Sequence, residues 1–145
     1  MNSIKEITTQ ETYLVRNLVL RPGKRIETCF FDGDNLEQTK HFGYFDDGKI
    51  IGVVSVYKNK NVIFKSPNQY QIRGMAILKE FQGSGCGKLL IKHCEDYLIS
   101  IGTNLIWFNA RETAVSFYEK LGYTKNGSPF AIADVGIHFL MFKNL

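Results

Sequence analysis

The sequence predicts a single α+β domain over residues 1–145, built on one mixed, mostly antiparallel sheet flanked by helices. Three observations predict this class. Antiparallel strand signals fill the first half of the chain, strands and helices alternate in the second half, and the length allows one hydrophobic core. The chain is 44% hydrophobic and 22% charged, which is typical of a globular domain and argues against a disordered or fibrous chain.

The first part of the chain is expected to form an edge strand and a helix. Residues 4–8 alternate between apolar and polar side chains, as a half-buried strand does. A helix then begins with Thr9 or Thr12 as its cap and ends near Arg21, because Pro22 and Gly23 follow. Its apolar face is expected to contain three residues at helical spacing: Leu14, Val15 and Leu18.

A long loop and a hairpin should follow this helix. Residues 24–40 show no periodic pattern, and long ordered loops in compact domains tend to be functional. The sequence Asp-Asp-Gly at 46–48 separates two strand-like segments, 41–45 and 49–57, which predicts a tight β-hairpin.

The second half should complete the sheet. The expected elements are, in order, a strand over 70–78, a helix ending near Ile101, a strand over 105–109, a helix over 112–121, and strands near Tyr123 and over 135–142.

Charge and cysteine usage exclude several classes of protein. The chain has 18 basic and 14 acidic residues, and this mild, scattered surplus is not the basic stripe of a nucleic-acid-binding protein. No apolar run reaches the roughly 20 residues that span a bilayer, and the first residues do not resemble a signal peptide. Three cysteines without CxxC spacing, and no HExxH, argue against a disulfide framework or a metal site. We therefore expect a cytoplasmic protein with no metal and no nucleic-acid or membrane partner.

The most informative segment is a glycine cluster between a strand and a helix. Gly83, Gly85 and Gly87 allow successive backbone N–H groups to point at a ligand beside a helix N-terminus, where phosphate or pyrophosphate binds. A P-loop is excluded because Lys88 is followed by Leu89 rather than Ser or Thr. A dinucleotide-binding fingerprint would belong to the first unit of a parallel sheet, whereas these glycines lie in mid-chain after an antiparallel hairpin, which argues against an NAD site. The structural alternative is a tight turn without a ligand.

The pattern Gln82-x-x-Gly85-x-Gly87 resembles the acetyl-CoA pyrophosphate loop of the GNAT superfamily of N-acetyltransferases. The preceding strand, Arg-Gly-Met-Ala-Ile at 73–77, is also similar to that family.

Two later segments extend the resemblance. Residues 109–123, with Asn-Ala-Arg followed by Phe-Tyr-Glu-Lys-Leu-Gly-Tyr, are similar to the family in residue type and spacing. The ending, Gly-Ile-His at 136–138 with Met141, is similar to small bacterial-type members. The resemblance covers residues 73–143 closely and 13–56 more loosely.

The resemblance implies a GNAT-like fold with acetyl-CoA in a cleft at the strand, glycine loop and helix. It implies transfer of acetyl from acetyl-CoA to a primary amine of a small molecule or peptide, by direct attack in a ternary complex. The alternatives are a non-catalytic acyl-CoA-binding sensor or regulatory domain and a nucleotide-binding protein. A homodimer is an option because the C-terminal strand is apolar.

The resemblance also implies which residues hold the cofactor. Met75, Ala76 and Ile77 would bind the pantetheine arm through their backbone, and one backbone N–H there would stabilise the oxyanion. Asn109 would contact the pantetheine or bound water, or it simply ends a strand. Arg111 either reaches a cofactor phosphate or lies in solvent. Seven residues would hold the pyrophosphate: Gln82, Gly83, Ser84, Gly85, Cys86, Gly87 and Lys88.

Tyr118 is expected to be one of the cofactor-binding residues. It is also expected to be the general acid that protonates the departing thiolate, because a phenol remains a proton donor at neutral pH. The alternative is a core aromatic residue. The base is left open, since residues 69–78 contain no carboxylate. A water chain or one of four side chains would take the proton, with His138 as the candidate we select: His138, His41, Asp32 and Asp34.

Two further hypotheses concern the acceptor and a cysteine. Acceptor selectivity is expected from residues 24–40 and 125–134. The acidic residues of the first segment would attract a cationic amine, although a solvated acidic loop is the commoner explanation. Cys86 lies at a helix N-terminus, which favours a reactive thiol, but we interpret it as a small loop residue.

Overall fold

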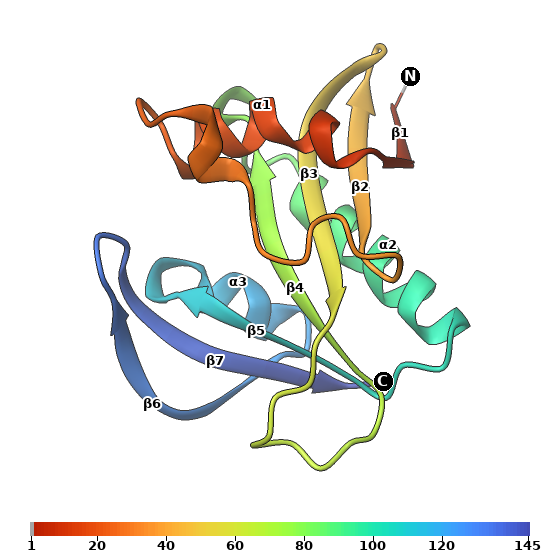
Figure 1. Ribbon diagram of the computed structural model, residues 1–145, viewed down its shortest axis with the longest axis vertical. Coiled ribbons are helices and arrows are strands. Elements are labelled where there is room, and N and C mark those ends of the chain that lie inside the picture. Colours follow the sequence, from red (N-terminus) through yellow and green to blue (C-terminus); the bar gives the residue numbers. More distant parts are fainter. Residues whose placement is uncertain (1) are drawn as a thin grey trace.

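The computed structural model describes residues 2–145 as one seven-stranded sheet with helices packed against it (Figure 1). Three short 3₁₀ helices, Ile26–Cys29, Lys79–Phe81 and Glu112–Ala114, interrupt the connections. The main elements are β1 (Asn2–Ile7), α1 (Thr9–Leu20), β2 (Lys40–Asp46), β3 (Lys49–Lys58), β4 (Gln69–Ile77), α2 (Cys86–Ser100), β5 (Leu105–Arg111), α3 (Val115–Lys120), β6 (Thr124–Ile132) and β7 (Gly136–Asn144).

The strand order is β1-β2-β3-β4-β5-β7-β6, which confirms the predicted single mixed sheet. All neighbouring strands are antiparallel except β4 and β5, which are parallel. These two strands pair only between 69–71 and 105–107. Beyond Gln71 they diverge, so the edge of β4 that faces β5 has no strand partner (Figure 1).

A bulge at Gly74 bends β4 at this point. Arg73 pairs with Ser55 and Ala76 pairs with Val53, so two residues of β4 stand opposite one residue of β3. Gly74 has φ +67°, and a Cβ there would lie 3.2 Å from Nε of Arg16 and 3.2 Å from the Phe31 ring. Only glycine therefore fits this position, and the bulge increases the local twist that carries β4 away from β5.

The predicted hairpin is confirmed. Asp47 and Gly48 have φ of 49° and 79°, the pair of positive values that a two-residue type I′ turn requires. The strands β2 and β3 extend one residue further than the predicted segments at most ends.

Helix α1 begins one residue earlier than predicted. The cap is Thr8, whose side chain accepts from the Glu11 amide while Glu11 Oε1 accepts from the Thr8 amide, a complete capping box. Thr9 and Thr12 are instead buried within the helix, where the Thr12 hydroxyl donates to the Thr9 carbonyl. The expected caps were therefore wrong.

The predicted apolar face of α1 is wrong for two of its three residues. Val15 is buried, but Leu14 is 65% exposed and Leu18 is 55% exposed. The side of the helix that faces the sheet holds Arg16 and two threonines as well as Val15. The helical spacing of the apolar residues did not predict which face of α1 is buried, because a polar network around Arg16 occupies that face.

Arg16 is the centre of this network and is fully buried. Its Nη1 lies 2.7 Å from Oδ2 of Asp34 and its Nη2 lies 3.0 Å from Oδ1, a two-pronged ion pair. Nη2 also donates to the hydroxyls of Ser55 and Tyr57. The ion pair ties α1 and the 24–40 loop to β3.

Burial by itself would raise the pKa of Asp34. The hydrogen bonds from Arg16, Tyr57 and the Phe31 amide outweigh burial, so that the pKa lies below its ordinary value of 3.8. His41 belongs to the same network: its Nδ1 contacts the Ser55 hydroxyl, and burial lowers the pKa of its imidazole.

The helix α2 packs on the opposite face of the sheet from α1. Leu90, Cys94 and Leu98 are fully buried, whereas Ile101 is exposed beyond the helix end. No helix in the described part of the chain is both long enough and apolar enough to cross a membrane.

The C-terminal strand β7 lies between β5 and β6. The apolar side chains of β7 are therefore accounted for by its two neighbouring strands in the same chain, and they give no separate support for a homodimer. Residues 125–134, from which acceptor selectivity was expected, are mostly the edge strand β6.

We predict that Asp34→Asn lowers the free energy of unfolding by about 3–5 kcal/mol, because it leaves the Arg16 guanidinium buried without its counter-ion. Urea denaturation measures this change. The control is Asp32→Asn, since Asp32 is exposed and makes no ion pair within residues 2–145; it should change stability by less than about 0.5 kcal/mol.

The same pair sets an acid dependence. Because the folded-state pKa of Asp34 is depressed, its contribution to stability is complete above the ordinary carboxyl value of 3.8 and is lost as pH falls through the lower folded-state value. The difference in stability between wild type and Asp34→Asn should therefore shrink below pH 4. A difference that stayed constant to pH 2 would contradict this account.

Candidate active site

A cavity of about 470 Å³ occupies the gap between the diverging strands β4 and β5. Its wall also includes the end of α1, the 24–40 loop, Tyr118 of α3 and the β6–β7 turn. Four of the residues predicted from the sequence line it: Met75, Asn109, Tyr118 and His138. Residues that are far apart in the chain thus meet where the sheet opens.

The glycine loop follows β4 and leads into α2. Gly83 and Gly85 have φ of 78° and 88°, a conformation that favours glycine, and no atom lies within 4 Å of a Cβ at either position. The backbone amides of residues 83–88 donate to no atom of residues 2–145; the first paired amide is that of Leu89, which donates to the Gly85 carbonyl. These amides lie at the positive end of the α2 dipole and are free to bind an anion.

Side chains of the loop hold its shape. Nε2 of Gln82 donates to the Ile77 carbonyl at 2.9 Å, and the Ser84 hydroxyl donates to the Phe81 carbonyl. A Cβ on Gly87 would lie 3.1 Å from the end of the Met75 side chain, so glycine permits close packing of α2 against β4. The loop therefore offers backbone rather than side chains to a ligand, apart from the exposed Lys88.

Cys86 is buried in the hydrophobic core and is not part of the cavity wall. Its Sγ lies 3.2 Å from the Ser84 hydroxyl. Cys86, interpreted from the sequence as a small loop residue, is therefore the first residue of α2 and packs in the core.

Tyr118 is a core residue and also a cavity residue. Its ring packs on Phe108 at 4.4 Å and on Phe117 at 5.0 Å between centroids, and the residue is 8% exposed. Its hydroxyl makes no hydrogen bond within residues 2–145. Among residues 2–145, Nε of Arg16 is the only fully buried side-chain nitrogen or oxygen without a hydrogen-bond partner. The Tyr118 hydroxyl, which also lacks a partner, is therefore not fully buried. Burial, with a smaller contribution from Cys94, raises the pKa of Tyr118 to about 12, so the phenol stays protonated at neutral pH.

His138 also lines the cavity, and its hydrogen bond fixes its neutral tautomer. Nδ1 lies 2.9 Å from the Gly136 carbonyl oxygen. A carbonyl oxygen only accepts, so Nδ1 carries the proton and Nε2 keeps a free lone pair when the ring is neutral. The ring is buried and stacks on Phe130.

The other three candidate bases lie elsewhere. His41 and Asp34 are held in the Arg16 network, and neither lines the cavity. Asp32 is exposed outside the cavity wall, and its carbonyl accepts a long hydrogen bond of 3.4 Å from Arg73. Of the four residues, the structure brings only His138 together with Tyr118.

Among the cavity residues that had no role assigned from the sequence are Arg21, Phe31 and Arg73. Arg73 lies in the strand that carries the family resemblance, but its side chain had no sequence pattern to mark it. Arg21 and Phe31 reach the cavity from the end of α1 and from the 24–40 loop, which no local spacing could reveal. Arg111, whose position the sequence left open, is exposed at the end of β5 and lines the cavity.

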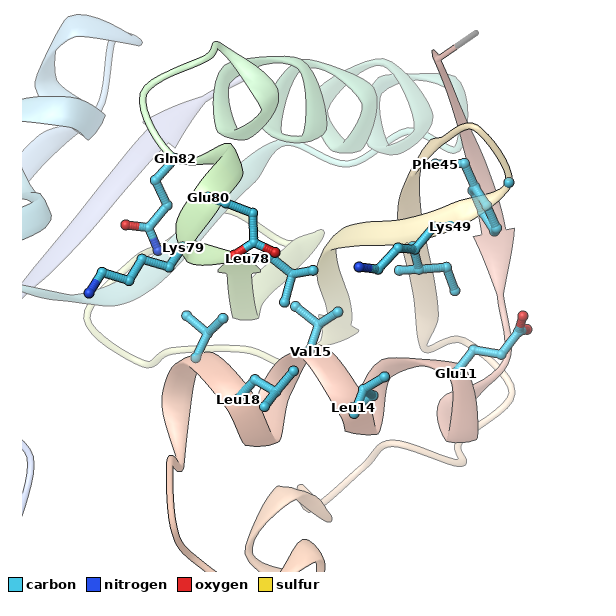
Figure 2. A pocket seen from close by; sticks show the side chains of 13 residues that line it. Glu11, Leu14, Val15, Leu18, Phe45, Lys49, Leu78, Lys79, Glu80 and Gln82 are labelled. Carbon is cyan, nitrogen blue, oxygen red and sulfur yellow. The ribbon is translucent and has the colours of Figure 1, made fainter.

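A second groove, of about 820 Å³, lies between α1, the β2–β3 turn and residues 78–82. Figure 2 shows its apolar floor, with Leu14, Val15 and Leu18 of α1 across from Leu78. It is larger than the cavity but contains neither Tyr118 nor His138. Because Tyr118 and His138 line only the smaller cavity, we assign the candidate active site to the cavity between β4 and β5 rather than to the larger groove. Among residues 2–145, no group of three or more His, Cys, Asp or Glu side chains is arranged to bind a metal ion.

The chain belongs to the GNAT family of acetyltransferases, whose family model matches residues 3–123, and it is therefore an acyltransferase. The Bacillus subtilis protein YitI, an uncharacterized N-acetyltransferase, is 36% identical over 145 residues, which cover 100% of this chain and 97% of YitI. Enzymes of this family use acetyl-CoA as donor and amines as acceptors.

Solved structures show the same fold. A crystal structure from Lactobacillus plantarum aligns with a TM-score of 0.81 at 18% identity, covering 99% of this chain and 98% of that one. An aminoglycoside 6′-N-acetyltransferase complexed with coenzyme A aligns with a TM-score of 0.75 at 15% identity, covering 98% and 96% of the two chains. These alignments confirm the predicted GNAT-like fold.

Proposed function

We propose that this chain transfers the acetyl group of acetyl-CoA to a primary amine, by direct attack of the amine while both substrates are bound. The observation that carries the proposal is the run of unpaired amides at residues 83–88, which directly follows the unpaired edge of β4. Unpaired backbone donors at a helix N-terminus fit a pyrophosphate, and an open strand edge fits the amide-containing pantetheine arm.

The residues that would hold acetyl-CoA follow from this geometry. The backbone of residues 75–77 would bind the arm, and the amides of residues 83–88 would bind the pyrophosphate. Asn109, on the facing strand β5, would contact the arm from the other wall of the cavity. When bound there, acetyl-CoA supplies an acetyl thioester.

Two protons must move during the transfer. As the new N–C bond forms and the C–S bond breaks, the amine loses one proton and the departing thiolate gains one. His138 accepts the first at Nε2, and Tyr118 donates the second from its hydroxyl. Both side chains line one cavity, which favours an enzyme over an acyl-CoA sensor, since binding alone requires neither group.

We predict that Gly85→Ala weakens acetyl-CoA binding by about tenfold. Gly85 has φ +88°, so a side chain there costs about 1–2 kcal/mol of backbone strain and displaces the amides of the loop. Isothermal titration calorimetry with acetyl-CoA measures the effect. Gly102→Ala is the matched control, because Gly102 has φ +84° with open space around it but lies at the other end of α2. Equal losses of affinity in the two variants would contradict the loop assignment.

We predict that Tyr118→Phe lowers kcat by about 100-fold or more, because the thiolate loses its proton donor. The affinity for acetyl-CoA should stay within about twofold of wild type, since the hydroxyl makes no hydrogen bond that holds the loop or the strand. Steady-state kinetics and calorimetry test the two statements. A variant with full turnover would remove Tyr118 from the mechanism.

We predict that His138→Gln lowers kcat/KM by about 100-fold, because the amide of glutamine does not take up the amine's proton as Nε2 of the imidazole does. Initial rates at limiting amine concentration provide the comparison. A variant that keeps the wild-type rate would assign the proton to water instead.

A further inference from the structure

The cavity wall is strongly basic. It contains Arg21, Arg73 and Arg111 together with His138, and it includes no Asp or Glu. The acidic residues of the 24–40 loop, which would have favoured a cationic acceptor, are absent from the wall: Asp34 is paired with Arg16, and Glu27 is paired with Arg25. The cavity wall is therefore positively charged, although the acidic residues of the 24–40 loop had suggested a site for a cation.

None of the three arginines has a carboxylate partner among residues 2–145. Arg21 donates to the Leu20 carbonyl at 3.0 Å and Arg73 donates to the Asp32 carbonyl at 3.4 Å, which leaves most of their N–H groups without an acceptor. Carbonyl groups do not neutralise a guanidinium, so the charges of both residues remain uncompensated.

Arg21 and Arg73 converge on one aromatic ring. Their guanidinium carbons lie 5.8 Å and 5.1 Å from the centroid of Phe31, which itself lines the cavity. The Arg73 guanidinium also lies 5.4 Å from the Tyr57 ring. These aromatic contacts hold the Arg21 and Arg73 side chains in place at the cavity wall.

The pyrophosphate of acetyl-CoA does not explain this cluster. The unpaired amides proposed to hold its pyrophosphate belong to residues 83–88, and none of these residues lines the cavity. The arginines instead reach the cavity from the α1 end, β4 and β5, and they line it together with Tyr118 and His138.

We propose that the acceptor is a primary amine that also carries an anionic group, a carboxylate or a phosphate, which Arg21 and Arg73 bind with Arg111 on the facing wall. A guanidinium presents a planar pair of donors that matches both anions, and its attraction is strong inside a partly closed cavity. A polycationic amine would meet three uncompensated positive charges. This inference rests on the proposed acetyltransferase function and names its acceptor class.

The test compares amines that differ only in the anion. The pairs are tyrosine with tyramine, 6-aminohexanoate with hexylamine, and O-phosphoethanolamine with ethanolamine; spermidine is the cationic member of the panel. We expect the anionic member of the carboxylate or phosphate pairs to have a kcat/KM at least about tenfold higher. A preference for the acid in the first two pairs indicates that the site binds a carboxylate, and a preference for O-phosphoethanolamine in the third pair indicates that it binds a phosphate. A preference for the members that lack the carboxylate or phosphate, or for spermidine, would overturn the inference.

Substitutions of the arginines test whether these residues cause the preference for the anionic compound. Arg21→Gln and Arg73→Gln should each reduce the preference for the anionic member by about tenfold and leave the affinity for acetyl-CoA unchanged. Arg25→Gln is the matched control, because Arg25 is exposed, pairs with Glu27 and does not line the cavity. If the variants weaken acetyl-CoA binding and leave the amine preference intact, the arginines serve the cofactor and the inference is wrong.

A binding measurement separates this inference from the proposed function. N-acetyltyrosine and N-acetyltyramine are titrated into the protein loaded with CoA, which requires no turnover. Preferential binding of N-acetyltyrosine, lost in Arg73→Gln, supports the anion site even if no tested amine is acetylated. Equal binding of the two compounds would overturn the anion site even in an enzyme that acetylates amines.

Discussion

The site depends on the bulge at Gly74. The Arg16 guanidinium and the Phe31 ring occupy the space where a side chain would be, so the backbone takes a positive φ that glycine tolerates. The extra residue in β4 turns the strand away from β5 after three paired positions. A continuous ladder between these strands would use the backbone groups of β4 and fill the cavity. The sheet is therefore opened at one place by one small residue.

The Arg16–Asp34 ion pair supports this opening from the α1 face. It joins a helix, a loop and β3 within a space that excludes water, and its geometry leaves the Phe31 ring stacked 4.2 Å from the Arg16 guanidinium carbon. A buried pair of this kind adds little net stability compared with apolar residues, but it is costly to break. Its value here is positional, because it fixes the loop that contributes Phe31 to the cavity wall.

The parts of the structure that the sequence predicted well are those decided by neighbours in the chain. The turn at Asp47-Gly48, the end of α1 before Pro22 and the glycine loop each follow from the conformations that these residues prefer. The parts it missed are decided by distant contacts. Leu14 and Leu18 have the spacing of a buried face, yet Arg16 and its partners occupy that face, because Asp34 and Tyr57 come from other elements.

The candidate site shows the same division. The roles of the glycine loop and Tyr118 were predicted because their residue types and spacing resemble a known family, and His138 was selected for its chemistry from four candidate bases. Arg21 and Phe31 were not, since they join the cavity only after a helix and a loop fold over the open sheet. Likewise, His41 and Asp34 have the chemistry of a base, but their partners remove them from the site.

The burial of all three cysteines has a practical consequence. Cys29, Cys86 and Cys94 are each at most 6% exposed, and burial raises the pKa of the Cys94 thiol well above its ordinary value. A disulfide dye added to the folded protein should therefore react slowly with the polypeptide itself. Colour would develop almost entirely from coenzyme A as it is set free, so that each turnover can be followed continuously without blocking or replacing any cysteine.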